Sequence, residues 1–242
     1  VLQVDKKTAE LKPVHEVINY INAMNQGLEA LEQIPLSLRL INDIHKILLD
    51  GVRGKDKTPG EYKNLQNWIG PPGCKINEAT YIPPSPGMMV ELMRDWENYY
   101  HEPSNIPLLI KAAILHSHFE TIHPYRDGNG RLGRLLITFM LCEKKILSRP
   151  LLYLSLFFKE NRDQYYQLLM NVRFKGEIEE WFKFFLRGVR SVSEEAIKTA
   201  NEIKKLRSGH IDLIKKRISR YRMALPFYDL ICKQPIINIT TA

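Results

Sequence analysis

The segment from His123 to Arg134 reads His-Pro-Tyr-Arg-Asp-Gly-Asn-Gly-Arg-Leu-Gly-Arg. It places a base, a carboxylate, a glycine-rich turn and, after that turn, two arginines within twelve positions. Its first two glycines can adopt positive φ angles, which turn successive backbone N–H groups toward one point. A helix predicted to begin at Arg131 adds the partial positive charge of its N-terminus there. The pattern indicates a loop that binds polyphosphate and carries its own proton acceptor.

This segment resembles the signature loop of Fic domains, the Fic/Doc superfamily. The resemblance extends beyond the loop to parts of the chain that look like the approach to the family's flap and like its later helices. These parts are Gly51–Lys55, Pro59–Tyr62, Gln66–Gly70, residues 150–155 and residues 161–166. One departure lies inside the loop, because Tyr125 stands where the family usually has phenylalanine. Since that ring anchors the loop in the core, we expect the added hydroxyl to be tolerated where it finds a partner.

The resemblance implies transfer of AMP from ATP to a Ser, Thr or Tyr hydroxyl of a target protein, with release of pyrophosphate, and leaves auto-AMPylation open. His123 is the expected general base, because an imidazole with a pKa of about 6.5 accepts protons at neutral pH. Asp127 is expected to hold Mg²⁺ through its carboxylate, while phosphate oxygens and water fill the other positions. Arg131 and Arg134 lie three apart, on one face of the first helical turn, where both can meet phosphate oxygens. Asn129 is expected to donate to the α-phosphate in the transition state.

The resemblance also implies the remaining nucleotide contacts. Tyr166 is expected to lie against the adenine, with core packing of its ring as the equal alternative, and Asn161 is expected near the same pocket. The full set of expected ATP contacts is Gly128, Asn129, Gly130, Arg131, Leu132, Gly133, Arg134, Asn161 and Tyr166. A zinc site at His116, His118 and His123 is disfavoured, because helical residues that share a metal are spaced three or four apart.

Helical periodicity dominates the chain and predicts an all-α fold. The resemblance implies that this fold is a Fic-type helical bundle with a short β-hairpin flap. The predicted helices cover residues 14–31, 40–48, 88–101, 106–121, 131–145, 161–174, 178–206 and 224–233. Two strand-like pieces, 66–69 and 79–82, are expected to pair within a flap at 66–83. An exposed hairpin edge of this kind could pair with an extended segment of the target protein.

The predicted Fic domain spans residues 1–206, with its core at about 36–190 and the flap inside it. Residues 207–242 are interpreted as a basic linker and the start of a truncated winged-helix-like region. Much of the net charge of +8 lies near this linker, as either a solvated helix face or a nucleic-acid footprint. DNA binding is expected only through a completed winged helix. The resemblance also implies an inhibitory helix that competes with ATP for Arg134. No stretch of this chain fits its pattern, so we expect that this helix either lies just upstream of Val1 or is absent.

The composition, with 44% hydrophobic residues, is that of a soluble globular protein. No apolar run is long enough to cross a bilayer and no secretory signal is present, so we expect a cytoplasmic protein without membrane contact. Three functions stay open as alternatives: a Fic-type de-AMPylase, a transferase of phosphate, phosphocholine or UMP, and a nucleotide-sensing DNA-binding regulator. A homodimer also stays open.

Overall fold

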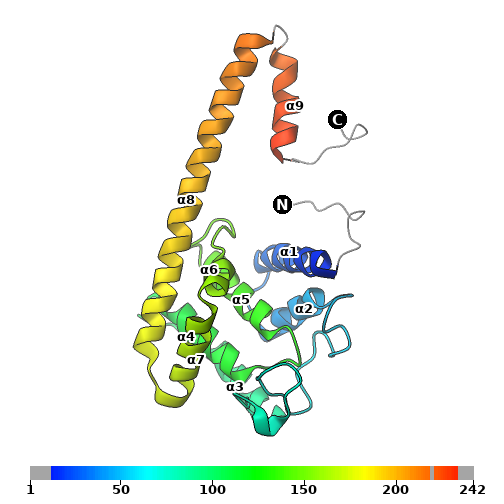
Figure 1. The fold of residues 1–242 in the computed structure, drawn as a ribbon, viewed down its shortest axis with the longest axis vertical. Helices are drawn as coiled ribbons and strands as arrows, with labels where there is room; N and C mark the ends of the chain where they lie inside the picture. The colour runs from blue at the N-terminus through cyan, green and yellow to red at the C-terminus, as the bar shows by residue number, and fades with distance from the viewer. Residues whose placement is uncertain (1–11, 219–220, 234–242) are drawn as a thin grey trace. The chain divides into compact units, whose positions relative to one another are not determined.

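A computed structural model of the chain describes residues 12–218 and 221–233. The helices in these residues are α1 (Lys12–Leu31), α2 (Leu38–Leu48), α3 (Pro86–His101), α4 (Leu108–Ile122), α5 (Asn129–Glu143), α6 (Leu154–Glu160), α7 (Arg162–Lys175), α8 (Ile178–Arg217) and α9 (Tyr221–Lys233) (Figure 1). The expected predominance of helix is confirmed. The chain forms two compact units, Val1–Val192 and Ser193–Ala242, and the loop that begins at His123 belongs to the first.

Helices α4 and α5 pack along each other and hold the loop between them. Helix α4 is apolar around most of its circumference, which is typical of a central helix, and Ala112, Ala113 and Leu115 are fully buried. The two helices approach closely at Gly133 of α5. A Cβ atom there would lie 2.6 Å from Glu120 Oε1 and 3.1 Å from Phe119 Cδ1, so only glycine permits this contact.

Helix α2 supplies a polar residue to the interior beneath the loop. Ser37 caps its N-terminus, where the hydroxyl oxygen accepts a hydrogen bond from Leu40 N at 3.4 Å. The buried face of α2 carries Leu40, Ile41, Ile44 and Leu48, as the spacing of these residues predicts. His45 lies on the same side of the helix and is fully buried.

The structure does not show the predicted β-hairpin. Residues 66–83 contain one isolated antiparallel bridge, between Ile69 and Tyr81, and a short 3₁₀ turn, η2 (Ile76–Glu78). Ile69 N donates to Tyr81 O at 2.8 Å, and Tyr81 N donates to Ile69 O at 3.1 Å. The pairing ends there because prolines follow on both sides, at positions 71 and 72 and at 83 and 84, and proline has no N–H to donate.

The C-terminal part is more helical than the sequence pattern predicts. Helix α8 was expected to end near Leu206 but continues to Arg217, through residues interpreted as a linker. Only one glycine, Gly209, interrupts that stretch, and basic side chains favour the negative end of a helix. Helix α9 agrees with the predicted helix at 224–233, while the segment from Pro235 expected to follow it lies outside the described residues. Across the described residues, every helix is too short or too polar to span a bilayer.

Candidate active site

The loop leaves α4 through a left-handed turn at His123, whose φ is 49° and ψ is 61°. Such a conformation is uncommon for a residue other than glycine, and Pro124 disfavours continuation of the helix. The chain enters α5 at Gly128, which has a φ of 81°. The first hydrogen bond of α5 runs from Leu132 N to Gly128 O at 3.0 Å. The backbone N–H groups of residues 129–131 therefore precede the bonded helix and are available to an anion.

His123 presents one ring nitrogen to solvent. The residue is partly exposed, and only Nδ1 of its ring is buried without a hydrogen-bond partner among the described residues, so Nε2 is the accessible nitrogen. Burial lowers the pKa of His123 to about 3, and the positive charges of Lys63 and Arg173 make smaller contributions in the same direction. The backbone carbonyl of Glu120 raises this pKa slightly. The imidazole is therefore neutral at pH 7, which is the state that a general base requires.

Tyr125 anchors the loop in the core. Its ring is fully buried and stacks on His45, with the ring centroids 3.8 Å apart. Its hydroxyl donates to Asn42 Oδ1 at 2.5 Å, so the polar atom that phenylalanine would lack has a partner. His45 Nδ1 accepts from Gly60 N at 2.8 Å, so Nε2 carries the proton and donates to Asp127 O at 2.9 Å. Burial lowers the pKa of His45 to about 4, in agreement with this neutral form.

The carboxylate of Asp127 belongs to a cluster of four charges. Its Oδ1 accepts from Gly128 N at 2.6 Å and lies 3.8 Å from a terminal nitrogen of Arg131. Its Oδ2 lies 3.9 Å from Arg53 Nε. Glu16 of α1 contacts both arginines, at 3.5 Å from Arg131 and 4.0 Å from Arg53. A surface hollow of about 550 Å³, lined by residues of α1 and by residues 51–56, borders this cluster.

The two arginines of the loop differ in their surroundings. Arg131 is 15% exposed and pairs with Glu16 and Asp127. Arg134 makes no hydrogen bond or ion pair within the part of the chain that the structure describes. Its guanidinium reaches back toward the start of α5, because a Cβ atom on Gly130 would lie 3.1 Å from one of its terminal nitrogens. Arg134 is therefore ready to bind an anion, whereas Arg131 must exchange partners to do so.

The side chain of Asn129 bonds within the loop. The residue is buried, its Oδ1 accepts from Tyr125 N at 2.9 Å, and its Nδ2 donates to Tyr125 O at 2.8 Å. Both ends of the side-chain amide bond to the loop's own backbone, so this residue holds the loop's shape. Whether it also donates to a phosphate, as expected, stays a prediction.

Leu132 and Gly133, also among the expected ATP contacts, pack toward the core. Leu132 is fully buried in the core, and Gly133 is the point of close approach between α4 and α5. Both follow the first turn of α5, so they orient the arginines on either side of them and lie on the protein side of the helix.

Tyr166 and Asn161 lie near the start of α7. The Tyr166 ring is 49% exposed, which excludes the alternative of core packing, and the Arg162 guanidinium lies 5.6 Å from its centroid. Its neighbour Tyr165 takes the core position, where its hydroxyl bonds to His116 Nε2 at 2.9 Å. Asn161 Nδ2 donates to Phe157 O at 2.9 Å, so that amide closes the end of α6.

Three residues beneath the loop were not found from the sequence pattern. Glu16 pairs with Arg131, His45 supports Asp127, and Asn42 receives the Tyr125 hydroxyl. His45 alone left a usable signal, because it is a polar residue on an otherwise apolar helix face.

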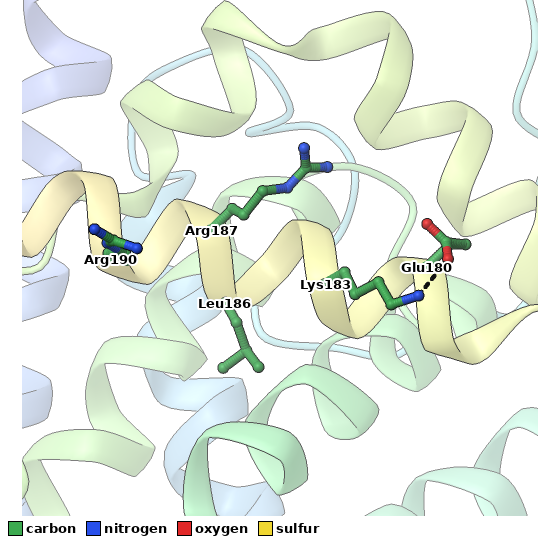
Figure 2. A pocket seen from close by; sticks show the side chains of 5 residues that line it. All are labelled: Glu180, Lys183, Leu186, Arg187 and Arg190. Carbon is green, nitrogen blue, oxygen red and sulfur yellow. Dashed lines mark hydrogen bonds and ion pairs between the residues drawn. The ribbon is translucent and has the colours of Figure 1, made fainter.

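A second surface hollow, of about 470 Å³, lies on α8 away from these residues. Figure 2 shows that all of its lining side chains come from one helix and point in different directions along it. Lys183 there bonds to Glu180 at 2.8 Å. The hollow is an open helical surface without converging polar groups, so we assign no site to it.

Comparison with known proteins agrees with the site. Residues 35–141 match the model of the Fic/DOC family. A probable protein adenylyltransferase of Aquifex aeolicus is 36% identical over 95 residues, which are 36% of this chain and 29% of that protein. The protein adenylyltransferase Fic of Drosophila grimshawi is 27% identical over 172 residues, 69% of this chain and 30% of that protein. The chain thus spans less than a third of the length of these curated relatives.

Solved structures show the same fold. A Fic family protein from Desulfovibrio desulfuricans G20 aligns with a TM-score of 0.63 and 25% identity, over 76% of this chain and 55% of that one. Fic-1 from C. elegans aligns with a TM-score of 0.58 and 21% identity, over 82% of this chain and 56% of that one. The helical bundle, the loop and these matches together show a Fic-type fold, with residues 35–141 matching the Fic/DOC family.

Proposed function

We propose that this protein is an adenylyltransferase that moves AMP from ATP to a Ser, Thr or Tyr hydroxyl of a target protein. The observation that carries the proposal is one loop that joins a neutral, solvent-facing imidazole to the unbonded N–H groups of a helix N-terminus. The names of the curated relatives support the same reaction. We expect it to take place in the cytoplasm.

In the proposed reaction, His123 Nε2 takes the proton of the incoming hydroxyl while the hydroxyl oxygen forms a bond to the α-phosphorus. The bond from the α-phosphorus to the oxygen that bridges to the β-phosphorus breaks, and pyrophosphate leaves with its electron pair. The N–H groups of residues 129–131 stabilise the negative charge on the α-phosphate oxygens, because fixed donors need no reorganisation as charge develops. Arg134, which makes no hydrogen bond or ion pair among the described residues, binds the outer phosphates.

Magnesium fits the donor set at Asp127. Mg²⁺ is usually held by one or two carboxylates together with substrate phosphates and water. The Asp127 side chain is 30% exposed and has carboxylate oxygens beside the start of α5. A bound Mg²⁺ would neutralise charge on the phosphates. Asp127 would hold it, and His45 fixes the backbone of Asp127 through its carbonyl.

The adenine is assigned to the exposed ring of Tyr166, and Asn161 is a weaker candidate because its amide is already bonded within α6. We propose that the target protein binds at the flap, residues 66–83. Main-chain pairing there could position the target's hydroxyl with little dependence on the target's sequence. Trp68 and Ile82 of the flap are 42% and 51% exposed, so its surface is accessible. We expect changes at residues 68–82 to weaken target modification and leave ATP binding intact.

The test is incubation with α-labelled ATP and Mg²⁺, with candidate target proteins and with the enzyme alone. Wild-type protein should retain label on protein, and His123→Ala should lose about 100-fold or more of the incorporation rate. Parallel incubations with labelled UTP and CDP-choline separate AMP transfer from transfer of other groups. Equal labelling by wild type and His123→Ala would disprove the proposal.

A further inference from the structure

Six consecutive backbone carbonyls surround the turn at His123, and each accepts a hydrogen bond from another segment. The last carbonyls of a helix have no partner within the helix, so they need outside donors when they are buried. The pairs are Arg173 to Glu120 O (2.8 Å), Tyr81 hydroxyl to Thr121 O (2.9 Å), Lys63 Nζ to Ile122 O (3.3 Å), Asn67 Nδ2 to His123 O (3.1 Å), Lys63 N to Pro124 O (2.8 Å) and Asn67 Nδ2 to Tyr125 O (3.0 Å).

Lys63 is the buried centre of this arrangement. It is 2% exposed, and its ammonium also donates to Asn67 Oδ1 at 2.7 Å, so one cation ties the end of α4 to the base of the flap. Burial lowers the pKa of Lys63 to about 8, which still leaves most of the population charged at pH 7. A lysine is rarely buried to this degree unless its charge has a role or a partner.

Arg173 of α7 occupies the other side of the turn. Its Nε donates to Thr121 Oγ1 at 3.1 Å, and its guanidinium lies 4.3 Å from the centroid of the Tyr81 ring. It therefore joins α7, the end of α4 and the flap at one point. Together, Lys63 and Arg173 place two positive charges beside the imidazole of His123.

We propose that Lys63 and Arg173 are positioning residues that fix the turn carrying His123 and keep its imidazole uncharged. This role deepens the adenylyltransferase function proposed above and rests on it. Carbonyls at the end of a helix attract a positive charge, so an uncapped α4 would favour a protonated histidine at this place. Because two cations already bind those carbonyls, the end of α4 offers no net attraction to a third.

The other charged groups near the turn do not reverse this effect. On α4 itself, the carboxylate of Glu120 is buried against α5, where the charges of Arg134 and Arg173 offset it. On the loop, the carboxylate of Asp127 is paired with Arg53 and Arg131. Among the described residues, His123 therefore has no carboxylate partner that would favour the imidazolium.

The experiment is an NMR pH titration of the imidazole of His123 in isotopically labelled protein, assigned by comparison with His123→Gln. In the wild-type protein the signal should remain that of neutral imidazole down to pH 5. In Lys63→Met, which keeps the side chain's bulk and removes its charge, the midpoint should rise by about one pH unit. Lys57→Met removes an exposed lysine six residues earlier in the same segment and should leave the midpoint unchanged.

Arg173→Met is the second variant, and it should shift the midpoint in the same direction. The acid limb of kcat/KM for AMP transfer should move upward with each midpoint, which a loss of stability alone would not produce. Circular dichroism confirms that each variant is folded. A wild-type midpoint above pH 6, or folded variants with the wild-type midpoint, would overturn the inference while leaving the proposed function in place. A different result would disprove the proposed function itself: label incorporation that persists in His123→Ala.

Discussion

Replacement of Asn129 by alanine tests whether this residue shapes the loop or contacts the nucleotide. In the structure its side chain supplies the acceptor for Tyr125 N and one of two donors to Tyr125 O. Asn129→Ala leaves a buried N–H without a partner, and a buried donor left unsatisfied costs about 1–3 kcal/mol. The carbonyl keeps its bond from Asn67, so its contribution to the loss is small. We therefore expect a decrease of about 2 kcal/mol in the free energy of unfolding.

For a unit of this size, 1 kcal/mol corresponds to a change of about 2–4 °C in Tm. The expected decrease for Asn129→Ala is thus about 4–8 °C, measured by calorimetry and checked by urea unfolding monitored through tryptophan fluorescence. Asn105→Ala, at an exposed loop position, is the matched control and should unfold like the wild type.

The two roles of Asn129 give opposite results. A residue that only contacts the α-phosphate would leave Tm unchanged when replaced, while ATP affinity or kcat would decrease. If Asn129→Ala retains the wild-type Tm and loses ATP binding, the side chain faces the nucleotide and our assignment of its hydrogen bonds is wrong.

Three other perturbations follow from the same structure. Burial lowers the pKa of His45 to about 4 and that of His116 to about 3, so the unfolded chain binds more protons than the folded chain below about pH 6.5. The free energy of unfolding should therefore decrease by about 1.4 kcal/mol per histidine and pH unit between pH 6.5 and 4. Equal urea midpoints at pH 7 and pH 5 would contradict this. Gly133→Ala should lower stability by about 1–3 kcal/mol, because its methyl group meets a side chain of α4 at 2.6 Å, and an unchanged Tm would argue against that contact. Glu16→Gln removes an anion that lies 3.5 Å from Arg131, so the KM for ATP should decrease up to about fivefold; an increase would mean that Glu16 orients the arginine.

The chemistry of the loop could be predicted because its parts are adjacent in sequence. Within twelve residues, chain connectivity alone keeps the imidazole, the carboxylate and the arginines together. The long helices were predictable because each buries one face, as in α2, where the apolar residues recur on one side. The need of the Tyr125 hydroxyl for a partner was also foreseeable, although Asn42 as that partner was not.

The supporting residues could not be predicted because they reach the loop from distant segments. Glu16, Lys63 and Arg173 belong to three different segments, and only the packing of those segments brings their charges to the loop. Asn129 shows a related limit, because an asparagine in a turn has the same sequence signature whether its amide bonds to the backbone or to a ligand. The flap shows a third limit. Its strand-like pieces lie beside prolines, which have no N–H to donate, so the pairing stops after one bridge.

The low pKa of His123 carries a consequence for catalysis. A base with a pKa of about 3 is always available at neutral pH, but it has little driving force to hold a proton. ATP brings several negative charges next to the start of α5, and nearby anions favour the imidazolium. Bound nucleotide should therefore raise the pKa of His123 toward the range in which general bases work well. Since kcat reports the enzyme–substrate complex and kcat/KM the free enzyme, the acid limb of kcat should lie at higher pH than that of kcat/KM. Burial, together with the two buried cations, then keeps the free enzyme's base unprotonated, and bound substrate should restore its basicity when the reaction can begin.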